Sequence, residues 1–250
     1  MFKRRKRVVV WLTMSGGLKL VMTALLVGLM LFMFTYELPA TSTWTNWTMP
    51  LSGKKIALDP GHGGPDGGAE SKDGIIEKDI NLAITLHLRD YLQEAGALVV
   101  MTREEDKDLA QPSTKGYSKR KTEDLVNRAQ FIIQQKSDMF VSIHLNAIPS
   151  VKWSGAQTFY YPTHKQSGVL AALIQDEVKK NLKNTDRVAK TVENVFLLKS
   201  LQIPSALVEV GFLSNPAEAN LLNTPAYQKK IAASIYQGIL RYYAGEKVGS

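Results

Sequence analysis

Strand-like and helix-like segments alternate along the chain from residue 54 to residue 243. Short apolar runs typical of buried strands are followed by longer stretches in which apolar residues recur at helical spacing. The predicted strands span 54–59, 97–103, 137–147, 156–162 and 203–212, and the predicted helices span 77–96, 122–136, 166–182 and 225–243. This order predicts one α/β domain, with a mostly parallel or mixed sheet covered by helices on both faces.

Residues 1–36 predict a membrane-targeting segment. A basic cluster at residues 3–7 precedes an apolar stretch, and residues 20–36 contain no charged side chain. These positions reach the lower limit for a helix that spans a bilayer. A cleaved signal peptide and a membrane anchor both fit, and Leu38 favours the anchor because it makes a poor cleavage site. In either case the domain that follows is exported.

The remaining boundaries follow from composition. Residues 37–53 are rich in Thr, Ser and Trp without periodicity, which predicts a linker between the membrane segment and a folded domain at 54–244. A short tail, 245–250, ends the chain. Within the domain, residues 104–121 are polar, basic toward their end and long for a loop, and loops of that length are uncommon unless functional or disordered.

The net charge of +8 does not indicate nucleic-acid binding. Six of the 31 basic residues precede the first acidic one: Lys3, Arg4, Arg5, Lys6, Arg7 and Lys19. Without them the chain has 25 basic and 23 acidic residues, whereas a nucleic-acid-binding domain should carry its own basic face. The chain has no cysteine, so a metal site would have to use His, Asp or Glu.

Three residues are candidate metal ligands. His62 follows the strand 54–59 in a glycine-rich turn, and His144 lies near the end of the strand 137–147. Ligand sites in α/β sheets gather at the carboxyl ends of strands, so the two side chains could converge. Glu77 opens the helix 77–96 and would face the same rim. Two histidines and one glutamate are an established ligand set of catalytic zinc.

Glu209 is the candidate proton-transfer group. It lies in an apolar strand, where burial raises the pKa of a carboxyl group toward the range of a general base or acid. Each of the four candidate residues also has a structural interpretation. His62 could be a turn residue and His144 a core histidine, while Glu77 could be a helix N-terminal charge and Glu209 a paired buried charge. His87 is interpreted as structural and His164 as a surface residue. A phosphate loop is disfavoured because Asp66 replaces a required glycine.

Five segments carry a family resemblance: "LDPGHGGPDGGA", "EKDINLAI", "MTREEDKDL", "FVSIHLNA" and "ALVEVGFLSN". In this order they resemble the zinc-dependent N-acetylmuramoyl-L-alanine amidases of bacterial cell walls, over about residues 54–244. The resemblance implies a six-stranded sheet, a zinc ion held by His62, Glu77 and His144, and Glu209 as the catalytic glutamate. It also implies peptidoglycan as the substrate.

The segments "DLAQPSTKGYSKRKTEDL", "IPSVKWSGAQTFYYP" and "EVGFLSNPAEANLL" further resemble the sporulation-type, germination-specific members of that family. This implies removal of stem peptides from muramic acid, a step toward muramic lactam in spore cortex. The enzyme would act at the outer face of the cytoplasmic membrane or in the cell wall, which in a sporulating cell means the space between the membranes around the forespore.

Several alternatives stay open at this point. A metal-dependent wall-glycan deacetylase or peptidase would use the same metal chemistry on a different bond, and a non-catalytic wall-binding protein is the third interpretation. Some family members carry a helix that covers the zinc groove, but residues 147–155 are too short for one. We therefore expect an open groove, or control by metal loading or by a protein partner. The sequence specifies neither that partner nor the oligomeric state.

Overall fold

The computed structural model describes residues 14–35 and 49–247. They form an N-terminal helix and a folded unit, which are described separately. The helix α1 (Met14–Thr35) is long and apolar enough over Met14–Met33 to cross a membrane, a property that an N-terminal signal sequence shares. An apolar helix therefore lies where the sequence predicts a signal or anchor. Residues 1–13, most of the predicted linker and the last residues of the tail lie outside the described residues.

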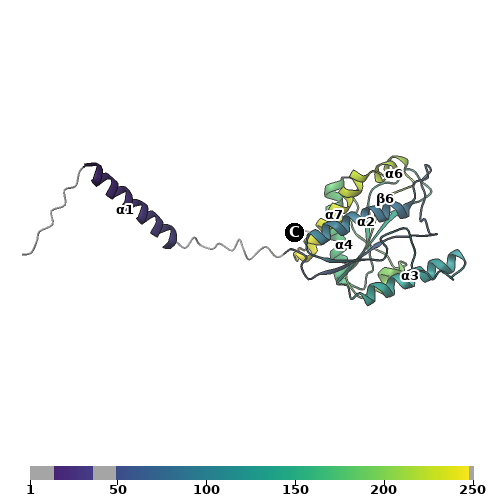
Figure 1. Ribbon diagram of the computed structural model, residues 1–250. Helices are drawn as coiled ribbons and strands as arrows, with labels where there is room; N and C mark the ends of the chain where they lie inside the picture. The colour runs from purple at the N-terminus through teal and green to yellow at the C-terminus, as the bar shows by residue number, and fades with distance from the viewer. Residues whose placement is uncertain (1–13, 36–48, 248–250) are drawn as a thin grey trace, which may run out of the picture. The chain divides into compact units, whose positions relative to one another are not determined.

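The folded unit is built on one mixed sheet (Figure 1). Its strands, in the spatial order β2-β1-β3-β6-β4-β5, are β2 (Leu98–Met101), β1 (Lys55–Pro60), β3 (Met139–Asn146), β6 (Ser205–Phe212), β4 (Gln157–Tyr160) and β5 (Lys190–Thr191). The first four are parallel, and β4 runs antiparallel to β6. The predicted six-stranded mixed sheet is confirmed.

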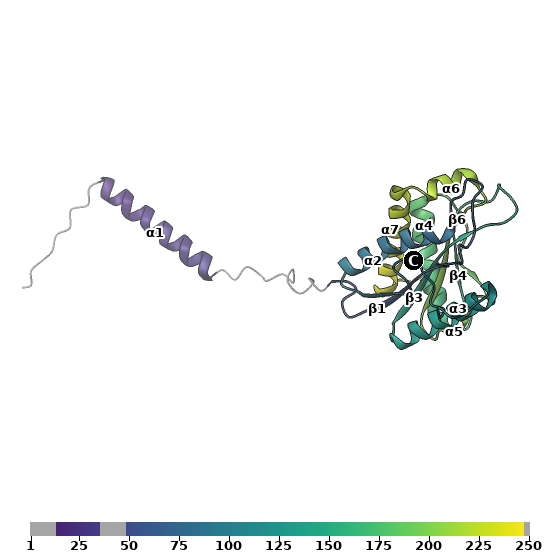
Figure 2. The same cartoon turned by 45° about the vertical axis from the view of Figure 1, so that its right-hand side comes forward.

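Helices cover both faces of the sheet, as predicted (Figure 2). They are α2 (Glu77–Glu94), α3 (Tyr117–Gln134), α4 (Lys165–Leu182), α5 (Phe196–Ser200), α6 (Pro216–Leu222) and α7 (Pro225–Tyr243). The larger core packs one face of the sheet against α2, α4 and α7, and a smaller core packs the other face against α3 and α5. Along α2, the buried Ile80, Ile84 and Leu88 recur every four residues, which gives the helix its apolar stripe.

The topology opens a crevice at the carboxyl ends of β1 and β3. The strand β1 lies between β2 and β3. From the carboxyl end of β1 the chain passes through α2 to β2 on one side, whereas from the carboxyl end of β3 it passes to β4 on the other side. The two connections therefore diverge where β1 and β3 end, which is the place where open α/β sheets bind ligands.

The structure differs from the predicted boundaries in two places. Helix α3 begins at Tyr117 rather than at residue 122, because Arg120 pairs with Asp108 and holds the preceding turn in helical conformation. The folded unit also includes residues 49–53, which the sequence assigned to the linker. Leu51 is fully buried there, and its backbone N–H donates to the carbonyl oxygen of Ala95 at 3.0 Å. The short elements β5, α5 and α6 had no counterpart in the prediction.

Candidate metal centre

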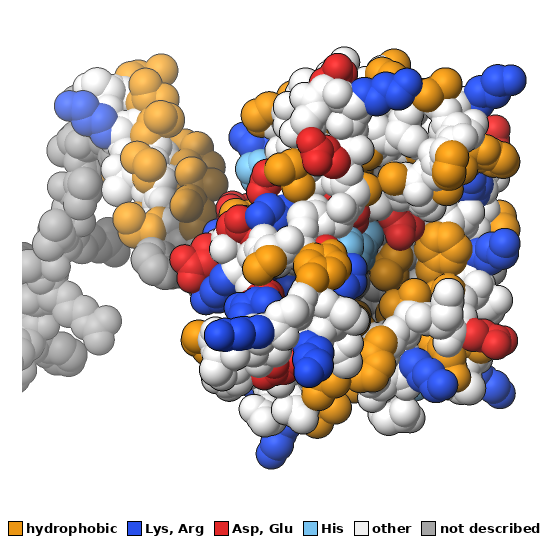
Figure 3. Space-filling model, turned by 90° about the vertical axis from the view of Figure 1, so that its right-hand side faces the viewer, with side chains coloured by type: hydrophobic (Ala, Val, Ile, Leu, Met, Phe, Trp, Pro, Cys, Tyr) orange, Lys and Arg blue, Asp and Glu red, His pale blue; other side chains and the backbone are white. Residues whose placement is uncertain are grey.

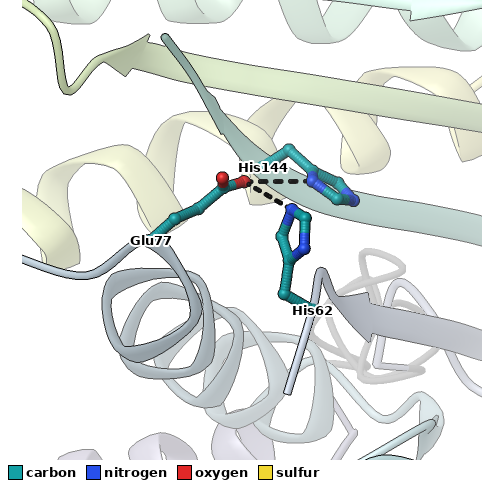
Figure 4. A group of neighbouring side chains, drawn as sticks. All are labelled: His62, Glu77 and His144. Carbon is teal, nitrogen blue, oxygen red and sulfur yellow. Dashed lines mark hydrogen bonds and ion pairs between the residues drawn. The ribbon is translucent and has the colours of Figure 1, made fainter. Parts of the chain in front are cut away.

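Three of the predicted site residues meet at the crevice (Figure 4). His62 projects from the loop after β1, Glu77 from the first turn of α2 and His144 from β3. One potential ligand atom of each residue lies within 4.8 Å of those of the others. Both imidazole rings approach Oε1 of Glu77, His62 through Nε2 at 3.2 Å and His144 through Nδ1 at 3.1 Å. This His/Glu/His group has the composition and the spacing of a metal site.

Glu77 is fixed by hydrogen bonds to both of its carboxylate oxygens. Oε1 accepts from the backbone N–H of Leu145 at 3.0 Å and from Nδ2 of Asn81 at 3.2 Å. Oε2 accepts from the backbone N–H of Ala69 at 2.8 Å. Burial opposes ionisation of Glu77, but its contacts with His144 and His62 outweigh burial and hold the pKa of Glu77 well below its usual range. The buried carboxylate is therefore charged, as a metal ligand must be.

His62 occupies an unusual backbone conformation. Its φ is +64°, in the left-handed region that costs an L-residue about 1 kcal/mol or more. Its carbonyl oxygen accepts from Nε of Arg103 at 2.7 Å and from Nη2 of Arg128 at 2.6 Å. Its ring nitrogen Nδ1 lies 2.9 Å from Oδ2 of Asp66. Since Nδ1 is engaged by a carboxylate, Nε2 is left to face Glu77 and is available to a metal.

The charges around His62 shift its pKa upward. Burial lowers the pKa of this imidazole, but Asp66 and Glu77 outweigh burial and raise it to about 9. Burial likewise opposes ionisation of Asp66, while His62, Lys121 and Tyr117 hold its pKa well below the usual range. A metal ion at Nε2 would replace one proton on this ring, so metal binding releases that proton.

Two buried arginines support the loop from beneath. Among the described residues, the guanidinium of Arg103 donates only to main-chain carbonyl oxygens, those of Pro60, Gly61, His62, Lys78 and Glu105. Arg103 therefore joins the loop that carries His62 to Lys78, the residue that follows Glu77. Arg128 pairs with Asp59 at 2.6 Å and with Asp124 at 2.9 Å. Burial raises the pKa of Asp59, but Arg128 and neighbouring hydroxyl groups lower it to about 2.

Sequence reasoning missed these supporting residues, although signals for some of them exist. Asp59 and Arg103 are charged residues that directly end or follow apolar strand runs. Arg128 lies four residues before the buried Ile132 on α3 and so shares its buried stripe. Asp66 was treated only as a mismatch to a phosphate loop, and its contact with His62 depends on the folded shape of the turn.

Two glycines make room for the ligands. A Cβ on Gly61 would overlap the imidazole ring of His144. Gly68 has φ of +71°, and a Cβ there would lie 2.5 Å from Oε2 of Glu77 and 2.7 Å from Cδ2 of His62. The glycine-rich turn thus lets the backbone pass close to all three candidate ligands.

Glu209 lies next to the group on the neighbouring strand. It is paired in register with His144 across β3 and β6, so the two side chains leave the same face of the sheet. Its Oε2 is buried and has no hydrogen-bond partner among the described residues. Burial raises the pKa of Glu209 to about 7, with Glu77 adding to the effect and the two histidines opposing it. The side chain can therefore both accept and release a proton near neutral pH.

The other two histidines lie elsewhere. His87 is on α2, ten residues after Glu77, which places it roughly 15 Å further along the helix. His164 precedes α4 and follows β4. Because β4 runs antiparallel to its neighbour β6, the carboxyl end of β4 lies beside the amino end of β6. It is therefore at the opposite end of the strands from the candidate metal centre. The structure brings neither of them to the centre.

The centre is accessible from the surface. Figure 3 shows pale blue histidine atoms in a hollow near the middle of one face, with red acidic atoms beside them. Ile148, Val151 and Leu213 line an adjoining pocket formed by the loops after β3 and β6. No helix lies between β3 and β4, residues that the structure describes throughout, as the short segment 147–155 predicts.

The chain is similar to known cell-wall amidases. The sequence profile of the family described as N-acetylmuramoyl-L-alanine amidase matches residues 56–241. The chain is 54% identical over 215 residues to the germination-specific N-acetylmuramoyl-L-alanine amidase of Bacillus subtilis (strain 168), covering 86% of this chain and 90% of that protein.

Solved structures agree with the sequence matches. The CwlD amidase from Clostridioides difficile, in complex with the GerS lipoprotein, is similar with a TM-score of 0.76 at 46% identity, over 77% of this chain and 100% of that one. An N-acetylmuramoyl-L-alanine amidase from Clostridium difficile 630 is similar with a TM-score of 0.69 at 31% identity, over 77% and 98% of the two chains.

Proposed function

Because the chain belongs to the N-acetylmuramoyl-L-alanine amidase family, we propose that His62, Glu77 and His144 hold a zinc ion and that Glu209 moves the proton in amide hydrolysis. The protein is a cell-wall amidase, a homologue of the germination-specific type. The bond broken would be the amide between the lactyl group of N-acetylmuramic acid and L-alanine.

The observation that carries the zinc assignment is the donor set itself. Two imidazoles and one buried carboxylate converge within 4.8 Å, and this is an established ligand set of catalytic zinc. The same donors also suit Fe(II), and membership in the amidase family favours zinc between the two. The unpartnered Oε2 of Glu209 adds a second sign, because a buried carboxylate oxygen is rarely left without a partner unless it has a chemical role. The residues present therefore fit zinc with one side open to substrate.

Glu209 carries the proton-transfer step. A bound zinc ion would supply Lewis acidity at this edge of the sheet. Glu209, as the carboxylate, takes a proton from the water that attacks the lactyl carbonyl carbon. The carbon–nitrogen bond then breaks as Glu209 returns that proton to the nitrogen of L-alanine, which leaves as a neutral amine. The lactyl group gains the water oxygen and becomes a carboxylic acid, which loses its remaining proton to solvent. A pKa near 7 suits both halves of this exchange.

The rigid surroundings of Glu77 hold the centre in one arrangement. Its two oxygens accept from three donors on three different segments, so its position is set before any ligand binds. Preorganised ligands lower the cost of binding, because less side-chain freedom is lost when the metal enters. The same fixed position of Glu77 keeps the catalytic groups correctly oriented although the groove is open.

We place the enzyme outside the cytoplasm, at the outer face of the membrane or in the wall. The apolar helix α1 near the N-terminus supports export or anchoring. The similarity to a germination-specific amidase supports a role in spore cortex, where removing stem peptides would precede formation of muramic lactam. In a sporulating cell the site of action would be the space between the two membranes around the forespore.

A protein partner is part of this proposal. The related CwlD amidase was solved together with the GerS lipoprotein, which supports a partner at the membrane surface for this chain as well. The groove beside the centre has no helical cover among the residues described between β3 and β4. Control by a partner, or by metal loading, would then replace control by a lid.

Mass analysis of digested peptidoglycan tests the proposal. Wild-type protein with zinc should release stem peptides with free L-alanine amino termini, and Glu209→Gln should abolish release while the protein still binds zinc. Glu193→Gln, the same change at an exposed carboxylate, is the matched control and should remain active. Full activity of Glu209→Gln would contradict the assignment, and loss of acetyl groups or cleavage within the stem peptide would favour a deacetylase or a peptidase instead.

A further inference from the structure

We propose that Tyr117 and Lys121, one turn apart at the start of α3, are positioning residues that act on His62 through Asp66. The proposal rests on the proposed metal centre, since it concerns the orientation of one of its ligands. It gives a role to the end of the long basic segment 104–121, which the amidase chemistry leaves unused.

Asp66 is held at both of its carboxylate oxygens. Oδ1 accepts from the hydroxyl group of Tyr117 at 2.8 Å and from the backbone N–H of Gly68 at 3.2 Å. Oδ2 lies 3.0 Å from Nζ of Lys121 and 2.9 Å from Nδ1 of His62. A carboxylate bound at both oxygens cannot rotate, so the direction of its hydrogen bond to the imidazole is fixed.

This arrangement fixes the tautomer of His62. An ionised carboxylate only accepts hydrogen bonds, so Nδ1 must carry the hydrogen and Nε2 must present its lone pair when the ring is neutral. Partners that orient a metal-binding histidine in this way typically change metal affinity by 10- to 100-fold. In this chain, the orienting carboxylate is itself oriented by a separate helix.

The side chains of Tyr117 and Lys121 both leave α3 toward Asp66. Tyr117 and Lys121 are four residues apart, so they share one face of α3, and Nζ of Lys121 lies 5.9 Å from the centre of the Tyr117 ring. The turn is anchored independently of the metal centre, because Arg120 pairs with Asp108. The tyrosine and the lysine are thus free to act on Asp66, rather than being needed to hold the helix.

Charge gives Lys121 a further part. The ammonium group of Lys121 contacts Oδ2 of Asp66, the oxygen that faces Nδ1 of His62, so it holds that oxygen in place and favours the charged carboxylate that accepts from the ring. We expect the lysine to influence the electron density on Nε2, and the tyrosine to influence mainly the angle of the ring.

Zinc affinity, measured by competition with a chromophoric chelator, tests the proposal, and the visible spectrum of the cobalt(II)-substituted protein gives a second readout. Tyr117→Phe and Lys121→Met should each weaken zinc binding about fivefold, the effect of one hydrogen bond. Asp66→Asn should weaken it about 10- to 100-fold. The cobalt spectrum should shift in all three variants, since it reports on the ligand field.

The decisive comparison is a double-mutant cycle. If both residues act through Asp66, then adding Tyr117→Phe or Lys121→Met to Asp66→Asn should cause no further loss of affinity. Both side chains are substantially exposed, 57% for Tyr117 as a residue and 40% for the Lys121 side chain, so the variants should fold. Lys119→Met removes an exposed charge from the same turn and is the matched control; it should leave zinc affinity unchanged.

Three results would overturn the inference. The Tyr117→Phe/Lys121→Met double variant could bind zinc as tightly as wild type, its effects could add fully to those of Asp66→Asn, or Lys119→Met could weaken binding equally. A wild-type protein that binds neither zinc nor cobalt would overturn the metal centre itself. That outcome is distinct from one in which the wild type binds zinc and the variants bind it with the same affinity.

Discussion

The two histidines of the proposed metal centre reach the same carboxylate from two different kinds of backbone. His144 is part of β3, a strand that lies between β1 and β6, and it is paired in register with Glu209 of β6. His62 lies in a loop with φ of +64° and needs two buried arginines at its carbonyl oxygen and Asp66 at its ring.

The difference shows where precision at this centre comes from. A ligand on a central strand is placed largely by the pairing of that strand with its neighbours, while a loop-borne ligand must be supported by dedicated side chains. We therefore expect sensitivity to substitution outside the ligands to concentrate on the His62 side.

The largest effect is expected beneath the His62 loop. Arg128→Met leaves Asp59 and Asp124 as buried carboxylates without their partner, which should lower the free energy of unfolding by about 3–5 kcal/mol. Urea unfolding measures this loss. Arg89→Met removes an arginine whose acidic partners are exposed and should cost less than about 1 kcal/mol. Equal costs for the two variants would break the asymmetry.

On the strand side, Glu209 should make the stability of the zinc-free protein depend on pH. Its pKa of about 7 in the folded protein lies above the ordinary 4.5, so the folded state binds more protons than the unfolded state between these values. Stability is then lost as pH rises through this window. Glu209→Gln should remove this loss and raise the free energy of unfolding at pH 8 by up to about 3 kcal/mol, with little change at pH 4. Chelator-treated protein unfolded in urea at both pH values checks this, and an equal effect at both would contradict the pKa.

The third prediction concerns the space that His144 needs. Gly61→Ala would place a methyl group against the His144 ring, so the ring must move; we expect a stability loss of about 1–3 kcal/mol and zinc binding weakened about tenfold or more. Gly67→Ala is the matched control in the same turn, where the new methyl group would lie 3.3 Å from a side-chain carbon of Ile76. Unaltered zinc affinity in Gly61→Ala would show that the strand ligand tolerates displacement.

The smallest effect is expected within the strand itself. Ile143→Val, next to His144, removes one buried methyl group and should cost about 1 kcal/mol of stability. Zinc affinity should not change, because the ladder of β3 stays intact. A marked loss of affinity, measured with the same chelator assay, would mean that the strand side also depends on exact side-chain packing.

The sequence predicted the sheet and the candidate ligands because both leave local patterns. Apolar periodicity identified the long strands and helices, and the ends of strands pointed to His62 and His144. The early start of α3 was not predictable, since Tyr117 follows a glycine in a polar stretch and its helix depends on the distant pairing of Arg120 with Asp108. Local patterns do not encode contacts of that kind.

The supporting residues were missed for a related reason. Arg103 donates to carbonyl oxygens of segments up to 43 positions away in the chain, and carbonyl oxygens are present at every residue and leave no mark in a sequence. Asp66 lies only four residues from His62, yet its role depends on the turn between them and on Lys121 from another element. A contact such as the one between Asp66 and Lys121 can be recognised only in the folded structure.

The most direct test of the metal centre is the zinc content of purified protein, measured together with amidase activity. Wild type should bind one zinc ion per chain and release stem peptides with free L-alanine amino termini. His62→Ala/His144→Ala should lose both the zinc and the activity while it remains folded. Stoichiometric zinc in that double variant, or full activity without zinc, would contradict the account.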